Sequence, residues 1–484
     1  MHRLSRWHQA AISDIKNKNM DVAERTLSLG SCKVTVLYIR QLTDRTALSD
    51  HIIKPLLNHG HEQNIKASDA IERIIVAGDC FADTDPNKIE QYILDGNTVL
   101  LFSGDTGYAV VNLIKVEKRA IPIPENMFTL RGPKDSFIED LDTNISLIRY
   151  RLKNKNLRIE KFYVGERTKT PVAVVYFEDI ANNKSVSEIK KRISRINTDG
   201  LSSSGELQAF LLNKKTDLFP QTGITERSDM ACGALLEGKI VVLMGGGPWA
   251  LIAPKVFSEY LWACDDFYMN KYFGTLARIL RVIALALSFI VSSLYLAIVS
   301  FHNDVLPSSF MIAIAQARAR VPFNAFVEVL LIEIIAELIR ESLVRVPSKI
   351  GTAIGIVGAI IIGQAAVSAG VFSPLLLIVV SLSLISSFVP ADFTIVDPFR
   401  VLKFIVIIAT GFFGFFGFTL ALLAIVANLV SINTFGVPYM APAAPFNAKD
   451  FLKSVFYSRS LASTRPAYLR TKDNTRSQVK KKSK

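Results

Sequence analysis

The chain has 484 residues, a formal net charge of +13 and a mean hydropathy of +0.30, and 50% of its residues are hydrophobic. The charge by itself suggests a nucleic-acid-binding protein, but no zinc finger, RNA-binding signature or basic sheet with interleaved aromatic residues accompanies it. Because eleven Lys and Arg residues fall in residues 447–484, beside the most apolar part of the chain, we exclude nucleic acid as a partner and expect contact with membrane lipid.

The apolar residues are unevenly distributed along the chain. Residues 1 to about 275 have the mixed composition of a soluble protein, residues about 279–432 are largely apolar, and the remainder is polar and basic. Apolar runs of about eighteen or more residues indicate transmembrane helices. The sequence therefore predicts an integral membrane protein with a large soluble N-terminal region.

The first residues of the chain favour a cytoplasmic N-terminal region. Residues 1–20 lack the apolar core of a secretory signal, so we expect this region to stay on the side where it is made. The cysteines follow no CxxC spacing, and we interpret them as reduced structural thiols. They are Cys32, Cys80, Cys232 and Cys264.

Apolar, β-branched runs in the N-terminal region alternate with helix-like segments such as residues 185–197. The runs predict strands at 32–40, 97–104, 108–116, 170–180 and 239–254. This alternation predicts α/β units, and the length favours two subdomains. We place them at residues 1–125 and 126–275, because residues 122–135 concentrate proline, glycine and polar residues.

No motif in this region predicts catalysis. The sequence GGGP at residues 245–248 lacks the lysine and the spacing of a phosphate-binding loop, and we expect a tight loop between two strands there. The histidines show no metal-ligand spacing, and neither a GxSxG nor a kinase signature is present. We therefore expect no enzyme, no cofactor and no metal site.

Four apolar segments predict spans of a membrane domain at residues 276–435. The first, residues 279–301, is long enough to cross a hydrocarbon core of roughly 30 Å, and Arg278 and Arg281 favour a cytoplasmic start. The others are residues 350–372, 374–390 and 401–432. The predicted fold class is an α/β two-subdomain soluble N-terminal region followed by an all-α polytopic membrane domain of four to five spans plus an amphipathic acidic helix.

Small residues recur in the second and last spans, where they permit close approach between helices. We assign helix packing to Gly351, Gly355, Gly358, Gly363, Gln364, Gly411, Gly414 and Gly417. Gln364 is interpreted as an interhelical hydrogen-bond donor. Between the last two spans, Asp392 and Asp397 lie beside prolines and mark an expected turn.

The two ends of the chain constrain the number of crossings. A cytoplasmic N-terminal region and a basic cytoplasmic tail at residues 436–484 require an even number of spans. Four spans satisfy this condition if the acidic segment at residues 321–347 does not cross. If it crosses, five spans would place the basic tail outside, against its charge.

The acidic segment carries four carboxylates, Glu328, Glu333, Glu337 and Glu341. On a helix the last three lie within about 80° of arc, whereas Glu328 lies about 140° from Glu333. Leu331, Ile335, Leu338 and Ser342 cover another face, so the helix is amphipathic.

Two interpretations of this helix remain open from physics alone. In one it lies at the membrane interface with its charges solvated, and Arg340 and Arg345 pair with Glu337 and Glu341. In the other, several subunits surround an axis and the four glutamates line a cation pore, since rings of carboxylates select cations. One subunit with four or five spans encloses little, so the pore requires an oligomer.

The chain resembles the A subunits of GerA-type spore germinant receptors. The likeness covers roughly residues 30–460 and is carried by three motifs, at residues 219–254, 345–374 and 431–445, of which the first two are long enough to be specific. The order of two soluble subdomains, a compact membrane domain and a short polar tail also agrees. One departure is ERSD at residues 226–229, where the family commonly has ERPD, and we interpret Ser228 as drift.

The resemblance implies a function in germination rather than a reaction. Such A subunits sit in the inner membrane of dormant spores with a transporter-like B subunit that binds the nutrient and a lipoprotein C subunit. They are thought to oligomerise into a nutrient-gated cation channel. The rival predictions are a secondary transporter, which needs internal repeats not seen here, and a membrane-tethered enzyme or scaffold. Glu226, Arg227 and Asp229 are candidates for a subunit contact, with a locally paired loop as the alternative.

Overall fold

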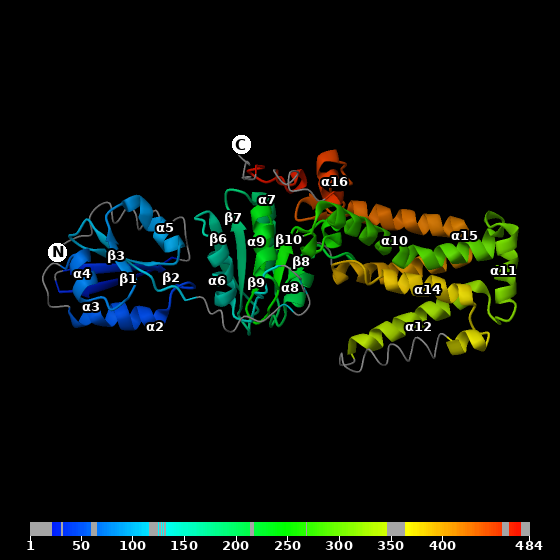
Figure 1. Ribbon diagram of the computed structural model, residues 1–484, viewed down its shortest axis with the longest axis horizontal. Helices are drawn as coiled ribbons and strands as arrows, with labels where there is room; N and C mark the ends of the chain where they lie inside the picture. Colours follow the sequence, from blue (N-terminus) through cyan, green and yellow to red (C-terminus); the bar gives the residue numbers. More distant parts are fainter. Residues whose placement is uncertain are drawn as a thin grey trace. The chain divides into compact units, whose positions relative to one another are not determined.

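The chain folds into two compact units. The computed structural model describes residues 22–475, apart from residues 31, 60–64, 116–123, 125–126, 128, 130–131, 213–216, 268, 346–363 and 457–463. The first unit comprises the described residues of 1–215, 222–254 and 462–484, and the second comprises those of 216–221 and 255–461. The chain therefore passes between the units four times, and Figure 1 follows it through both.

The first subdomain is a five-stranded sheet with helices on both faces. The strands are β1 (Val22–Leu29), β2 (Cys32–Ile39), β3 (Cys80–Asp83), β4 (Thr98–Phe102) and β5 (Tyr108–Val111), in the order β1-β2-β4-β5-β3. One face packs against α2 (Arg45–Ala47), the π-helical turn η1 (Leu48–Ile53), α3 (Lys54–Asn58) and α4 (Ala67–Arg73). The 3₁₀ turn η2 (Pro86–Lys88) leads into α5 (Ile89–Leu94), which covers the other face.

The second subdomain repeats this plan with different helices. Its strands are β6 (Leu157–Val164), β7 (Thr170–Phe177), β8 (Gly223–Thr225), β9 (Ile240–Met244) and β10 (Ala250–Ala253), in the order β6-β7-β9-β10-β8. The helices α6 (Leu141–Arg151) and α9 (Ser228–Glu237) bury one face, and α7 (Asn183–Ser194) and α8 (Ser204–Leu211) complete the subdomain. The predicted loop at 245–248 is confirmed, because it joins the paired strands β9 and β10.

Both sheets differ from the predicted α/β arrangement in one respect. Every described strand pair in them is antiparallel, including the neighbours β2–β4 and β7–β9. Hairpins join β1 to β2, β6 to β7 and β9 to β10, and such short links permit only antiparallel pairing. The subdomains are therefore of the α+β type, and the prediction of α/β units is wrong on this point.

The second unit is helical. Its short elements are η3 (Phe257–Leu261), η4 (Cys264–Phe267), η5 (Asn303–Val305), η6 (Phe393–Ile395) and the strand pair β11 (Asn433–Thr434) and β12 (Val437–Pro438). Its helices are α10 (Lys271–Phe301), α11 (Ser308–Arg318), α12 (Ala325–Arg345), α14 (Pro374–Ser386), α15 (Val396–Ser431) and α16 (Ala448–Val455). Helix α10 packs against α12, α14 and α15. Figure 1 shows α14 and α15 on either side of α10.

Two helices in the described residues are long and apolar enough to cross a membrane, Lys271–Phe301 and Phe393–Ser431. They contain the predicted span at 279–301 and residues 401–431 of the predicted span at 401–432. The predicted span at 374–390 forms the shorter apolar helix α14, and most of 350–372 lies outside the described residues. The structure thus supports two of the four to five predicted spans. Helix α15 has a kink at Gly414, where φ is 61°.

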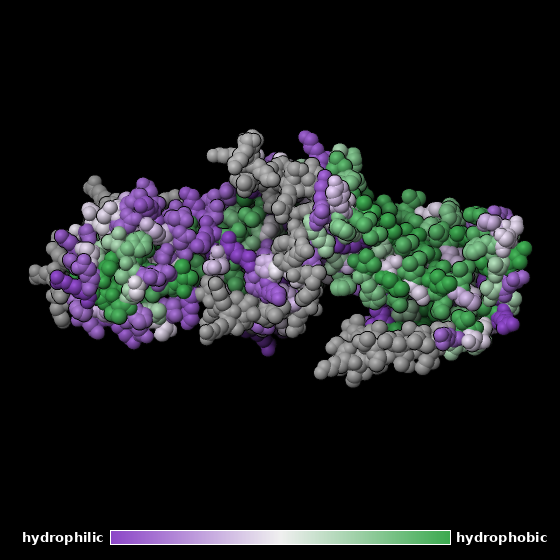
Figure 2. All heavy atoms as spheres, in the orientation of Figure 1, coloured by the Kyte–Doolittle hydropathy of each residue, from purple (hydrophilic) through white to green (hydrophobic). Residues whose placement is uncertain are grey.

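The surface of the helical unit is rich in large apolar side chains. Figure 2 shows hydrophobic residues over the visible face of α10, α14 and α15. The exposed residues of α15 alone include Phe412, Phe413, Phe416, Leu420 and Leu423. Contiguous apolar surface of this kind marks a membrane or protein contact.

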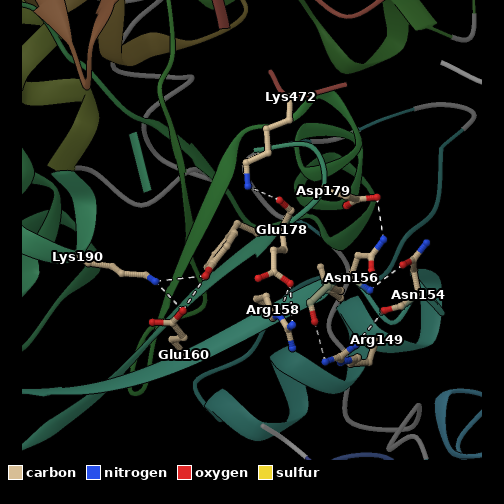
Figure 3. Close-up of polar contacts among 11 residues, drawn as sticks. Arg149, Asn154, Asn156, Arg158, Glu160, Glu178, Asp179, Lys190 and Lys472 are labelled. Carbon is tan, nitrogen blue, oxygen red and sulfur yellow. Dashed lines mark hydrogen bonds and ion pairs between the residues drawn. The ribbon is translucent and has the colours of Figure 1, made fainter. Parts of the chain in front are cut away.

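The predicted tail divides between the two units. Residues 437–456 belong to the helical unit, whereas residues 464–475, with η8 (Ala467–Leu469), pack on the second subdomain. Lys472 donates from its backbone N to Ile180 O at 2.9 Å and from Nζ to Glu178 O at 2.6 Å, and Figure 3 shows the latter contact. Gly238, with φ at 92°, lets the Thr471 side chain approach where a Cβ would collide with it. Residues 464–475 of the predicted tail are therefore a folded part of the first unit.

Candidate functional site

The acidic helix α12 buries two of its carboxylates in the bundle and leaves several large aliphatic side chains exposed. Glu328 and Glu333 are 0% and 1% exposed, whereas Leu338 is 64% exposed. Leu331 and Ile334 are exposed as well. The helix is amphipathic as predicted, but its polar side faces neighbouring helices. This is the reverse of the usual arrangement in water and suits apolar surroundings, where burial of charge requires partners.

Glu333 forms a buried ion pair where α10, α12 and α15 meet. Lys403 on α15 donates to its Oε2 at 2.5 Å, and Ser292 on α10 donates to its Oε1 at 2.5 Å. Lys403 is itself buried. In a region of low dielectric, this geometry offsets part of the cost of removing both charges from water.

Further polar groups lie on the helices that hold this pair. Ser383 on α14 donates to the carbonyl of Ser288 on α10 at 2.7 Å, which links two helices by a side chain. Thr410 on α15 donates to Val406 O at 2.6 Å. Ser293 is fully buried, and its hydroxyl has no hydrogen-bond partner among the described residues. The interior of the bundle is therefore polar as well as charged.

Glu328 is held at a different junction, between α11 and α14. Its Oε1 accepts the backbone N–H of Ser373 at 2.6 Å, and Arg318 Nε lies 3.4 Å from Oε2. Ser373 is the N-cap of α14, so the carboxylate lies at the positive end of that helix dipole. The helix dipole of α14 and Arg318 thus compensate the buried charge of Glu328. The position of Glu328 away from the other three glutamates on the helix did not predict these partners.

Glu337 pairs across helices rather than along its own. Arg400 on α15 donates to Glu337 from both Nε, at 2.6 Å, and Nη2, and it contacts Asp397 through Nη1 at 2.9 Å. Arg340 instead donates to Ser387 on α14 at 2.8 Å. The predicted pairing of Arg340 with Glu337 is therefore wrong, because tertiary partners are nearer than the neighbour along the helix. Glu341 is exposed, and the side chain of Arg345 lies outside the described residues.

Sequence reasoning found the carboxylates but missed their partners. The missed residues are Ser292, Arg318, Ser373, Arg400 and Lys403. Lys403 was detectable, because a lone lysine within an apolar span of 401–432 requires an anionic partner. The backbone N–H of Ser373 carried no comparable signal, since any residue supplies one.

The glycines of the last span lie at close contacts. A Cβ on Gly411 would run into the ring of Phe326 on α12, and one on Gly414 would lie 2.8 Å from Phe301. Gly417 lies behind the kink, against the backbone of Ala409. Gln364 is exposed, and Gly351, Gly355, Gly358 and Gly363 lie outside the described residues. Their role in helix packing remains a prediction.

The candidate subunit contact is paired within its own subdomain. Arg227 is fully buried and makes two hydrogen bonds to Asp229, at 3.0 and 2.8 Å. Glu226 accepts the backbone N–H of Met127 at 2.5 Å. These contacts match the locally paired alternative, and the subunit contact remains a prediction.

Ser228, which the sequence interpretation treated as drift, has defined partners. Its hydroxyl donates to Asp135 and accepts from Arg151 Nε at 2.8 Å. Burial raises the pKa of Asp135, but the bonds from Arg151 and Ser228 outweigh it and hold this pKa below its usual value. Nearby, burial raises the pKa of the Cys232 thiol to about 12.

Comparison with known proteins identifies relatives along nearly the whole chain. A family model described as Bacillus/Clostridium GerA spore germination protein matches residues 10–468. Spore germination protein KA of Bacillus subtilis is 35% identical over 440 residues, covering 90% of this chain and 81% of that protein. The uncharacterized membrane protein YfkQ of the same organism is 32% identical over 421 residues, covering 87% of this chain and 82% of that protein.

Part of the chain is also similar to a solved structure. It is the N-terminal domain of the A subunit of the Bacillus megaterium spore germinant receptor GerK3. The identity is 26% and the TM-score 0.39, with 51% of this chain and 94% of that chain covered.

Proposed function

This chain belongs to the GerA family of spore germination proteins, and from that premise we propose that it is the A subunit of a germinant receptor. In this role it takes part in the response of dormant spores to nutrients. Membership of the family over residues 10–468 supports the role in germination. The nutrient itself would be bound by a transporter-like B subunit, and a lipoprotein C subunit would complete the receptor.

We place the protein in the inner membrane of the spore, with the N-terminal region and the tail on the cytoplasmic side. Two helices able to span a membrane and the apolar surface of the helical unit support a membrane location. The basic residues of the tail support the cytoplasmic side, since positive residues are retained there.

We further propose that several copies form a nutrient-gated cation channel. The observation that carries this proposal is the charged interior of the helical unit, above all the buried pair of Glu333 and Lys403. Ionisable residues at such depth are costly and mark ion pathways in membrane proteins. Because Lys403 neutralises Glu333 within one subunit, conduction requires either a path between copies or release of this pair on activation.

The partly exposed carboxylates fit a path between copies better than the buried ones do. Glu337 retains a side-chain exposure of 23%, and Glu341 is exposed at the end of α12. In an oligomer these two residues could face a shared axis, with Glu333 behind them. The four glutamates therefore divide into an outer pair that is at least partly exposed and an inner pair that is buried.

A scaffold is the second candidate, and the complete pairing of Glu333 favours it. A buried ion pair can specify how helices pack without any role in conduction. The charges would then stabilise one arrangement of α10, α12 and α15, and another subunit would conduct.

Potassium release from spores that depend on this receptor separates the two functions. Glu333→Ala, Glu337→Ala and Glu341→Ala would be introduced singly, with Leu338→Ala as the matched control on the exposed aliphatic face of the same helix. Protein abundance in the spore membrane would be measured by immunoblot. The channel predicts slower release after nutrient addition at normal abundance for Glu337→Ala and Glu341→Ala, and unchanged release for Leu338→Ala.

Two other results would favour the scaffold. Release that falls only in proportion to abundance means that the carboxylates serve folding. Release that is unchanged in all three glutamate variants removes the helix from the conduction path.

A further inference from the structure

The short helix α16 is amphipathic, and its polar side faces the helical unit. Asn447 caps it by accepting the backbone N–H of Asp450 at 3.3 Å. Asp450 is buried and pairs with Lys453 at 3.1 Å. The charged residues of α16 that point inward are thus matched locally.

Hydrogen bonds hold the C-terminal end of α16 against the first turns of α10. Arg278 donates through Nη1 to the carbonyls of Lys453 and Ser454, at 3.3 Å each, and Trp262 donates to Ser454 O at 3.2 Å. These are the carbonyls that a helix leaves without partners at its C-terminus. A cation there also opposes the negative end of the helix dipole. The position of α16 within the helical unit is therefore specified by directional bonds.

The opposite side of α16 presents large apolar side chains to the surroundings. Phe446, just before the helix, is 70% exposed, and Phe451, Leu452 and Phe456 are exposed too. The rings of Phe446 and Phe451 lie 5.6 Å apart, so they form a continuous aromatic surface. In Figure 2 hydrophobic and hydrophilic residues lie side by side around α16. Exposed apolar side chains on a helix with a buried polar side call for an apolar occupant.

The first turns of α10 carry the same kind of surface. Tyr272, Phe273 and Leu276 are exposed there. At 1.5 Å per residue, the 31 residues of α10 extend about 46 Å, well beyond the roughly 30 Å of a hydrocarbon core. The opening turns of α10 therefore reach the headgroup layer if the apolar stretch that follows crosses the core. Aromatic residues concentrate at that level of a membrane.

We propose that α16 and the first turns of α10 form a lipid-binding belt, residues 271–276 and 446–456, that lies at the boundary between phospholipid headgroups and acyl chains. The belt continues the apolar surface of α10, which is a candidate span. The exposed Lys271 and Lys449 are placed to meet lipid phosphate. Interfacial anchors likewise combine exposed phenylalanine and leucine residues with lysines.

The belt would also connect the membrane surface to a buried charge cluster. Arg278, which holds the end of α16, lies 3.3 Å from Asp266, and Arg281 lies 2.7 Å from the same carboxylate. Asp266 is fully buried. Movement of α16 in the interface would therefore be transmitted to the start of α10 through Arg278. This consequence holds whether or not the protein conducts ions.

Photo-crosslinking in a lipid bilayer tests the proposal on the full chain. Benzoylphenylalanine would replace Phe456 in one protein and Leu452 in another, and the exposed Tyr163 on β6 in a control. Each protein would be reconstituted into vesicles of phosphatidylcholine and phosphatidylglycerol, irradiated and analysed by mass spectrometry. Two belt positions are used because one label alone could disturb the local fold.

We expect phospholipid adducts at positions 456 and 452 and none at position 163. Absence of lipid adducts at both belt positions overturns the proposal, whether the label stays unreacted in water or links to another protein chain. Equal lipid labelling at position 163 overturns it too, because lipid contact would then not be specific to the belt.

Discussion

Replacement of Glu333 by glutamine should loosen the interior of the helical unit, because it leaves Lys403 buried without a counter-ion. The two charged atoms lie 2.5 Å apart and both side chains are almost fully buried. Loss of one member of such a pair costs about 3–5 kcal/mol, since the remaining charge stays desolvated. The stability of the surrounding helices should fall by about that amount.

The same reasoning predicts that removal of both charges is tolerated. Glu333→Leu combined with Lys403→Met keeps the volume and removes both desolvation penalties, and such replacements are often neutral or stabilising by about 1–4 kcal/mol. Glu341→Gln is the matched control, because it makes the same chemical change on the same helix at an exposed position. Its effect should stay within about 0.5 kcal/mol.

Hydrogen exchange followed by mass spectrometry on the full chain in detergent micelles is the suitable assay. It reports the local opening of α10, α12 and α15 separately and does not require the two units to unfold together. A loss of 3 kcal/mol corresponds to about hundredfold faster exchange in peptides from these helices. The double variant should exchange at the wild-type rate or more slowly.

Two outcomes would refute the reasoning. Unchanged protection in Glu333→Gln would mean that Lys403 does not depend on this carboxylate in the folded chain. A double variant as unstable as the single one would mean that the loss reflects packing rather than an unpaired charge.

Three other changes test separate parts of the structure. Gly411→Ala should destabilise the helical unit by about 1–3 kcal/mol, because the added Cβ meets an aromatic ring of α12. Gly233→Ala is the control and should be neutral or stabilising, because the space around its Cβ is open. Hydrogen exchange measures both. Cys232 should react far more slowly than Cys80 with a thiol reagent at pH 8, because burial raises the Cys232 pKa to about 12; equal rates would contradict its burial. Ser228→Pro should lower the free energy of unfolding by less than about 1.5 kcal/mol, measured by chemical denaturation. Ser228 is the first residue of α9, a position that suits proline, and only the hydrogen bonds of its hydroxyl are lost. A larger decrease would show that the backbone does not fit proline.

Much of the architecture follows from local sequence features. The apolar runs at 279–301 and 401–432 lie in long helices because each contains enough apolar residues to cover a membrane core. The glycine-rich loop at 245–248 closes a hairpin because it separates two buried β-branched strands. The direction of strand pairing was not determined in this way, since alternation of strands and helices occurs in both parallel and antiparallel sheets.

In the candidate site, too, the sequence pattern predicted only local features, and tertiary contacts decided the rest. The spacing of Glu333, Glu337 and Glu341 fixed which residues share a side of the helix, because that depends only on 3.6 residues per turn. It did not fix which way this side points. In an apolar environment the preferred direction is inverted. Glu333 and Glu337 face other helices because Lys403 and Arg400 on α15 pair with them, whereas Glu341 is exposed.

The sequence by itself determined the family, the apolar helices and the positions of the four glutamates. Only the tertiary structure decided that Lys403, Arg400 and Arg318 are their partners, because these residues lie far from the glutamates or on other helices. It also decided that residues 464–475 return to the second subdomain. The physical reason is the same in both cases: a buried charge or a docking loop is stabilised by groups brought together in space, and no periodicity in the chain records which groups those are.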